Sequence, residues 1–133
     1  MPISALCHCG AVTVEVPTAP TEATRCNCSY CQRTGALWAY YPADALKVTA
    51  KAALGDYAPT GLNHHHFCGT CGGNTHGISF DWNSAYNADG TPKDGYVVGT
   101  VPEGRIGALN VNMLQDFDVS SISIHNVDGR NNW

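Results

Sequence analysis

The spacing of seven cysteines is the strongest constraint on what this 133-residue chain can fold into. They form three groups, Cys7-x-Cys9, Cys26-x-Cys28-x-x-Cys31 and Cys68-x-x-Cys71. An odd number of cysteines cannot all pair in disulfides, and the first residues lack the charged and apolar regions of a secretory signal. We therefore predict a cytoplasmic protein whose cysteines bind metal ions.

Composition narrows the class of protein. Hydrophobic residues make up 44% of the chain and charged residues 14%, which favours one compact domain over residues 1–133. The formal net charge of -4, with seven scattered Lys and Arg residues, argues against a phosphate-binding surface. No apolar run reaches the length of a membrane-spanning helix. Neither nucleic acid nor a membrane is expected as a partner.

Short β-branched and aromatic runs predict a mainly β fold. Val12, Val14 and Val16 alternate with polar residues, which indicates a half-buried strand over residues 11–16. Similar runs predict further strands at 36–41, 46–50, 76–80, 96–101, 106–111 and 119–124. One short helix is expected near Cys31. Residues 81–95 lack an apolar period and are interpreted as a flap over a site or as a surface insertion.

Four of the cysteines are predicted to form a closed metal site. Cys68-Gly-Thr-Cys71-Gly-Gly has the spacing of a zinc knuckle. Cys7 and Cys9, placed on a strand, would leave one face about 6–7 Å apart at their Cα atoms. Four thiolates saturate tetrahedral zinc, so this site would be structural. The alternative is that these cysteines are buried apolar residues without a metal.

The remaining three cysteines, Cys26, Cys28 and Cys31, leave one position of a tetrahedral zinc ion free, as in catalytic sites. Three thiolates make zinc a weak electrophile, which disfavours hydrolysis and favours a thiol as the fourth ligand. We therefore predict two Zn²⁺ per chain, one structural and one catalytic.

The histidines at 64–66 allow a second interpretation of the three-cysteine site. One of His64, His65 and His66 could supply a fourth ligand and close it. Otherwise they are strand residues, with His64 and His66 on one face, and one near the site could transfer a proton. Zinc deaminase chemistry is set aside because no histidine has Glu two residues later.

Four segments resemble the glutathione-dependent formaldehyde-activating enzymes, a group that also includes centromere protein V-like proteins. They are "CHCGAVTVEV", "CNCSYCQRTGALWAYY", "HHHFCGTCGG" and "ALNVNMLQDFD". All seven cysteines match that family in order and spacing. The resemblance implies twisted, stacked antiparallel sheets stapled by zinc, as in the Mss-four-like zinc proteins. It implies the same division into a structural zinc at Cys7, Cys9, Cys68 and Cys71 and a catalytic zinc at Cys26, Cys28 and Cys31.

The resemblance also implies an activity. It is that of a zinc-dependent carbon-sulfur lyase, which adds glutathione to formaldehyde to give S-(hydroxymethyl)glutathione. Glutathione is then the co-substrate, and a small-molecule thiol and aldehyde are the partners. The alternative is a non-catalytic zinc-binding or interaction module with the same cysteine frame.

Residues around Cys26–Cys31 are candidates for substrate binding. Arg33 is predicted to bind a carboxylate of glutathione, and Arg25 flanks the cysteines on the other side, although a solvated surface arginine is the alternative for both. Nearby aromatic residues could wall a pocket or belong to the core: Tyr30, Trp38, Tyr40 and Tyr41.

Overall fold

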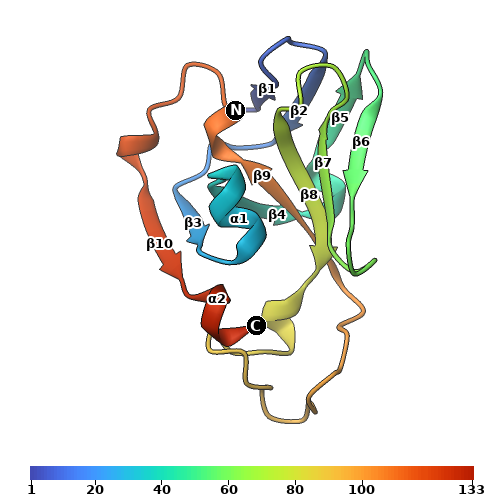
Figure 1. Cartoon of the computed structure of the whole chain (residues 1–133). Coiled ribbons are helices and arrows are strands. Elements are labelled where there is room, and N and C mark those ends of the chain that lie inside the picture. Colours follow the sequence, from blue (N-terminus) through green and yellow to red (C-terminus); the bar gives the residue numbers. More distant parts are fainter.

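The computed structural model describes residues 1–133 and consists of two β-sheets with a few short helices (Figure 1). The three-stranded sheet has the order β1 (Ile3–Leu6), β2 (Val12–Val16) and β5 (Lys47–Ala50). The seven-stranded sheet has the order β10 (Ser123–Val127), β3 (Glu22–Cys26), β4 (Trp38–Pro42), β9 (Arg105–Asn110), β8 (Asn74–Phe80), β7 (His64–Cys68) and β6 (Leu54–Tyr57). The α-helices are α1 (Ser29–Thr34) and α2 (Gly129–Asn132), and the 3-10 helices are η1 (Ala43–Ala45), η2 (Trp82–Ser84), η3 (Val111–Met113) and η4 (Val119–Ser121). No helix has the length and apolar character needed to cross a membrane.

The core lies between the two sheets. In β2 the side chains of Val12, Val14 and Val16 are fully buried, so the alternation in the sequence reports a real inner face. Residues from both sheets share one apolar cluster, which includes Ala5, Val14, Val16, Ala39, Tyr41 and Leu109. Burying a valine side chain contributes about 1.5 kcal/mol or more, so this inner face is a main source of stability. The predicted mainly β fold of stacked sheets is confirmed, with one parallel strand pair, β3 with β10, beside the antiparallel ones.

The seven-stranded sheet has a second face, which carries different side chains. Ala39 and Tyr41 of β4 face the core, so Trp38 and Tyr40 point to the opposite side. Helix α1 connects β3 to β4 and lies in front of β4 in Figure 1. The Trp38 indole contacts Cys31 of that helix, which places α1 on the face away from the core.

Five predicted strands are present with ends shifted by one or two residues, at 11–16, 36–41, 46–50, 76–80 and 106–111, and so is the short helix near Cys31. The prediction for 119–124 is wrong in its first half. There η4 forms because the Asp118 side chain accepts a hydrogen bond from Ser120 N, and the strand starts only at Ser123.

The strand predicted at 96–101 is wrong. Gly95 and Gly99 have φ of +87° and +91°, which an extended strand does not allow, and the segment forms turns instead. Val97 is 71% exposed and Val98 82% exposed, so their β-branched side chains do not report a buried strand.

The predicted 81–95 loop consists of turns and one 3-10 helix and lies at the lower end of Figure 1. It begins with η2, where the Trp82 indole donates a hydrogen bond to Asn63 Oδ1 at 2.9 Å. Tyr86 and Pro92 form an isolated bridge within it. Gly90 lies directly against the backbone carbonyl of Asn132, so the loop contacts α2. A role as a flap over a site stays a prediction.

Candidate metal centres

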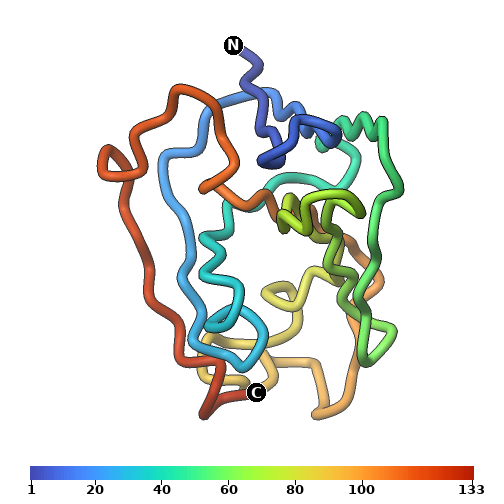
Figure 2. Tube along the Cα trace, turned by 45° about the horizontal axis from the view of Figure 1, so that its top comes forward, coloured from blue at the N-terminus to red at the C-terminus, as the bar shows by residue number.

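Four cysteine sulfurs from two distant turns meet at one point. Cys7 and Cys9 lie in the turn between β1 and β2, whereas Cys68 ends β7 and Cys71 lies in the turn that follows. Residues 68–73 are here called the knuckle. Figure 2 shows the blue N-terminal segment near the yellow-green knuckle, in its upper half. All four Sγ atoms lie within 4.8 Å of one another. The expected grouping of these four residues is therefore present.

The placement of Cys7 and Cys9 on a strand is wrong. Strand β1 ends at Leu6, and Gly10 N donates to Cys7 O at 3.0 Å to close a turn, in which Gly10 has a φ of +79°. The knuckle is built similarly, because Gly72 N donates to Cys68 O at 2.9 Å and Gly72 has a φ of +75°. The tight turns let backbone N–H groups face sulfur: Val12 N lies 3.3 Å from Cys7 Sγ and Thr70 N 3.4 Å from Cys68 Sγ.

The sulfur distances in this four-cysteine cluster fit a tetrahedral metal ion. The Sγ atom of Cys9 lies 3.7 Å from that of Cys7 and 3.6 Å from that of Cys68, so these are free thiols and not disulfides. Sulfurs bound at about 2.3 Å to tetrahedral zinc lie about 3.8 Å apart. The cluster therefore has both the donor type and the spacing that zinc requires.

Backbone N–H groups prepare the knuckle for negative charge. Those of Cys9 and Gly73 lower the pKa of the Cys71 thiol to about 6, and those of Cys71 and Thr70 lower the pKa of Cys68. At Cys9 the Ala11 N–H favours the thiolate, but desolvation and the neighbouring thiols raise the pKa to about 11. Four thiolates so close together repel one another, so the full set needs a cation among them.

The other three sulfurs gather in residues 26–31, here called the hook. Cys26 ends β3, Cys28 is the N-cap of α1, and Cys31 lies in the first turn of that helix. Cys28 N lies 3.4 Å from Cys26 Sγ, and Cys31 N 3.4 Å from Cys28 Sγ. Gly35 then ends the helix with a φ of +68° and its N–H bonded to Cys31 O. Local backbone geometry alone thus brings the three thiols within 4.8 Å of one another.

The hook has three ligand side chains and no fourth. The group of atoms that could hold an ion contains only Cys26, Cys28 and Cys31, with no His, Asp or Glu among them. The interpretation in which a histidine from 64–66 closes the site is therefore not supported by the geometry. The arrangement fits a metal that keeps one position open.

Burial makes two of the three hook thiols, Cys26 and Cys31, hard to ionise without a cation. Burial raises the pKa of Cys31 to about 12, helped by Cys28 and Cys26, although the Trp38 N–H at 3.3 Å favours the thiolate. Burial also raises the pKa of Cys26. Burial opposes ionisation of Cys28 as well, but the Cys31 N–H and other donors outweigh it and lower its pKa.

Aromatic side chains stack beside the hook. The Tyr30 ring lies over the His65 ring with centroids 3.8 Å apart, and over the Tyr57 ring at 5.8 Å. Trp38 lies next to His65, with centroids 6.4 Å apart. Tyr40 is 47% exposed as a whole residue, but desolvation of its hydroxyl raises the pKa to about 12, and the charges of the three hook cysteines add to this shift. The aromatic residues named from the sequence are thus divided: Tyr30 and Trp38 lie at the hook, Tyr40 lies on the same face of β4 as Trp38, and Tyr41 lies in the core.

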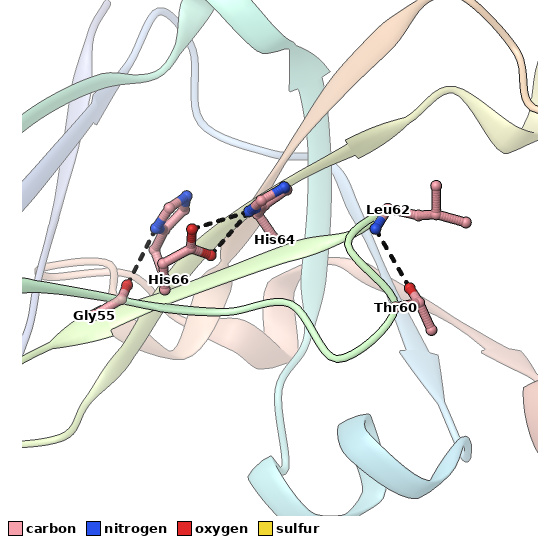
Figure 3. Close-up of polar contacts among 6 residues, drawn as sticks. Gly55, Thr60, Leu62, His64 and His66 are labelled. Carbon is pink, nitrogen blue, oxygen red and sulfur yellow. Dashed lines mark hydrogen bonds and ion pairs between the residues drawn. The ribbon is translucent and has the colours of Figure 1, made fainter.

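The three consecutive histidines point to two sides of β7. His65 stacks on Tyr30 of the hook, so it faces the hook. His64 and His66 alternate with it along the strand and lie side by side on the other face, as Figure 3 shows for these two rings. The His64 Nδ1 atom is 3.0 Å from both carboxylate oxygens of Asp56, and His66 Nδ1 is 3.1 Å from Gly55 O. The His66 ring also stacks on His76 of β8 at 4.8 Å.

The two arginines make different contacts. Arg33 Nη1 donates to Ser29 O at 2.8 Å, so one nitrogen of its exposed guanidinium is used within its own helix. Arg25 lines a cavity of about 270 Å³ together with Asn27, Asn126, Val127 and Asp128. Glutathione binding by either arginine stays a prediction.

Two contacts of the hook had no signal in the sequence. Asn74 Nδ2 lies 2.7 Å from the Tyr30 hydroxyl, and Asn74 Oδ1 is buried without a partner. Gly129 of α2 lies against Cys26 Sγ. Both contacts join segments that are more than 40 residues apart, so only the fold could reveal them.

Comparisons with known proteins agree with this architecture. Residues 2–87 match the sequence profile of the glutathione-dependent formaldehyde-activating enzyme family. A crystal structure of a Rhodobacter sphaeroides protein is similar, with a TM-score of 0.61 and 28% sequence identity, over 92% of this chain and 99% of that one. A search of curated proteins gave no match. Because the profile covers more than half of the chain, including all seven cysteines, this protein belongs to the glutathione-dependent formaldehyde-activating enzyme family.

Proposed function

We propose that this protein is a zinc-dependent carbon-sulfur lyase that adds glutathione to formaldehyde and cleaves S-(hydroxymethyl)glutathione in reverse. The observation that carries the proposal is the hook, where three thiols meet without a fourth ligand side chain. Membership in the family supports glutathione and formaldehyde as the substrates.

The two cysteine clusters then have different tasks. Cys7, Cys9, Cys68 and Cys71 would hold a structural zinc ion, and Cys26, Cys28 and Cys31 a catalytic one. When bound at the hook, zinc supplies an open position for the sulfur of an incoming thiol and lowers the pKa of that thiol. The hook residues fix where the sulfur arrives, because Trp38 holds Cys31 through its indole N–H.

The aromatic stack shapes the space beside the hook. Tyr30 and His65 lie in face-to-face contact at 3.8 Å, and Trp38 continues the wall. Such a wall excludes water from one side of the reacting atoms and orients a small aldehyde beside the sulfur.

The reaction needs one proton. The thiolate sulfur attacks the carbonyl carbon, the C–S bond forms, and the π electrons of the carbonyl move to oxygen, which then takes up a proton. We assign this proton to Tyr40, because Tyr40 lies on the same face of β4 as Trp38, whose indole contacts Cys31, and because its hydroxyl, with a pKa of about 12, carries its proton at pH 7. The thiol releases its own proton to solvent when it ionises, and solvent returns a proton to Tyr40 afterwards, so the protons balance. Of the three histidines that the sequence suggested as proton donors, only His65 faces the hook. Burial lowers the pKa of His65, which disfavours its protonated form, so we assign His65 to the wall and not to proton transfer.

Arg33 is retained as the residue that binds a glutathione carboxylate. Its guanidinium is exposed two residues after Cys31 and uses only Nη1 within the helix. The remaining N–H groups suit a carboxylate.

Exchange NMR of formaldehyde and glutathione tests the activity directly. Wild type is expected to accelerate exchange above the uncatalysed rate, and Cys31→Ser to lose the acceleration. Tyr40→Phe should reduce it by about 100-fold, because positioned proton transfer contributes roughly that factor or more. Tyr41→Phe is the matched control, since its hydroxyl bonds to Thr18 O on the core side.

The alternative, a non-catalytic zinc-binding module, makes the opposite prediction. Wild type and Cys31→Ser would then show the same exchange rate across a panel of thiols and aldehydes. That result, together with a cobalt-loaded hook whose spectrum does not change on adding glutathione, would replace the lyase proposal by the binding module.

A further inference from the structure

The segment of residues 123–133, here called the strap, lies against the hook. It comprises β10 and α2, and it follows the residues that match the family profile. Strand β10 pairs in parallel with β3 along five residues, ending with Val127 opposite Cys26. Figure 1 shows β10 alongside β3 and α2 just beyond the end of that pair. The strap therefore reaches the hook at its first cysteine.

Hydrogen bonds fix the strap to the residue between the first two hook cysteines. Asn27 N donates to Val127 O at 3.2 Å, and Asn27 Nδ2 donates to Asp128 Oδ1 at 3.0 Å. Arg130 N in turn donates to Asn27 Oδ1 at 2.9 Å. Both the backbone and the side chain of Asn27 are thus hydrogen-bonded to the strap. These bonds place Gly129 against Cys26.

Gly129 is buried, and a side chain there would collide with sulfur. An ideal Cβ atom on Gly129 would lie 2.6 Å from Cys26 Sγ, and 2.9 Å and 3.0 Å from Nε1 and Cε2 of Trp133. Contacts below 3.0 Å do not occur for real Cβ atoms, so one of these neighbours would have to move. The φ of Gly129 is not in the left-handed region, so the need for glycine is one of space.

We infer that Gly129 is a positioning residue of the hook, whose missing side chain lets the Cys26 sulfur share one metal ion with Cys28 and Cys31. This inference rests on the proposed function, in which the hook holds a metal. A cysteine that only fills space can rotate about its single side-chain torsion to avoid a new methyl group. A cysteine that binds a metal cannot rotate without leaving the ion. A methyl group at residue 129 should therefore weaken metal binding at the hook and spare the four-cysteine cluster.

The test measures the affinity of each metal site in Gly129→Ala. The full-length protein is loaded with Co²⁺, whose thiolate charge-transfer bands report both sites, and titrated with a chelator. Wild type should release two ions per chain in two steps. The step that is missing in Cys31→Ser belongs to the hook. In Gly129→Ala the Co²⁺ affinity of this hook step should fall about ten-fold or more, and the affinity of the other step should not change. Gly104→Ala is the matched control, because the nearest atom to its Cβ would be Asp81 Cβ at an ordinary 3.7 Å.

A double variant distinguishes the contact of the new methyl group with the Cys26 sulfur from its contact with the Trp133 indole. Gly129→Ala with Trp133→Ala removes the indole contact and keeps the sulfur contact, so the hook should stay weakened. Restored affinity in this double variant would overturn the inference, because Trp133 and not Cys26 would then be the cause. Wild-type affinity in Gly129→Ala would overturn it too, while leaving the proposed function intact. A wild type that binds one ion per chain would overturn both.

Stability measurements keep the test decisive if Gly129→Ala folds poorly. In a Cys26→Ala background the sulfur is gone, so adding Gly129→Ala should lower the melting temperature much less than it does in wild type. Equal losses in the two backgrounds would show that the methyl group does not act through Cys26.

Discussion

Asn74 and Tyr30 join the two cysteine clusters, because the Asn74 side-chain amide lies 2.7 Å from the Tyr30 hydroxyl. Asn74 begins β8 three residues after Cys71, and Tyr30 directly precedes Cys31. Asn110 Nδ2 also donates to Asn74 O at 2.9 Å, and Asn110 Oδ1 accepts from Leu37 N at 3.4 Å. A polar network thus runs from the knuckle to the helix that carries the hook.

Removing the Tyr30 hydroxyl should therefore lower the free energy of unfolding, although Tyr30 is only partly buried. Tyr30→Phe leaves the Asn74 amide without its partner, which typically costs about 1–3 kcal/mol in the free energy of unfolding. Urea unfolding would measure this loss. Tyr57→Phe is the control, because Tyr57 also stacks on Tyr30 but is 50% exposed. A loss as small as that of the control would show that the hydrogen bond contributes nothing.

We expect freshly purified protein to contain two zinc ions per chain, because the thiols divide into a set of four and a set of three. Elemental analysis measures the ratio directly. Finding one zinc, together with three thiols that react freely in the native state, would mean that the hook does not hold a metal.

The two clusters should respond differently to loss of a thiol. Cys68→Ser should unfold or aggregate the protein, because Cys68 is fully buried and its cluster joins segments about 60 residues apart. Cys31→Ser should fold, with a smaller drop in melting temperature and with one ion lost. Thermal melts and metal analysis of both variants decide this, and equal melting losses would contradict the division into structural and catalytic sites.

His76 should make the protein less stable in acid. Burial and the neighbouring His66 lower its pKa to about 4, below the ordinary value of 6.5. The unfolded chain then binds the proton more readily than the folded one between these pH values. Its contribution is fully present above pH 6.5 and is lost as pH falls towards 4, on the order of 3 kcal/mol in the limit.

His76→Gln should flatten this part of the pH dependence, as measured by urea unfolding between pH 4 and 7. Both proteins keep all seven cysteines, so acid release of metal cancels in the comparison. His8→Gln controls for the loss of an imidazole at an exposed position. A His76→Gln profile parallel to wild type would show that another group is responsible.

The hook could be predicted from sequence because its geometry is local. Cys28 caps the helix in which Cys31 lies, so a spacing of three residues already fixes how the two thiols meet. The same holds for the knuckle, where Gly72 allows the turn that the spacing requires. The turn at Cys7 and Cys9 is harder to predict, because the alternating valines from Val12 onward suggest that a strand already includes the two cysteines. In the structure Gly10, with its positive φ, closes a turn at this point, and β2 starts only at Val12.

The surroundings of the hook could not be predicted, because they depend on which strands pair. His65 reaches Tyr30 only because β7 is placed two strands from β9 and three from β4. Gly129 reaches Cys26 only because β10 adds in parallel to β3, more than 90 residues earlier in the sequence. No local pattern of charge or hydrophobicity marks either position. At 96–101 a local pattern was present but misleading. Its valines suggested a strand, whereas the glycines beside them place the segment in exposed turns.

The parallel pairing of β3 with β10 also sets an order of events during synthesis. Cys7, Cys9, Cys68 and Cys71 have all left the ribosome before the strap is made, so their zinc can bind to a nascent chain. Cys26, Cys28 and Cys31 emerge before Cys68 and Cys71, whereas their neighbour Gly129 follows more than 50 residues after Cys71. Closing so long a loop is slow relative to local folding. We therefore expect both cysteine clusters to be able to form before the strap pairs with β3, so that the strap adds the last contacts around the hook and not the hook itself.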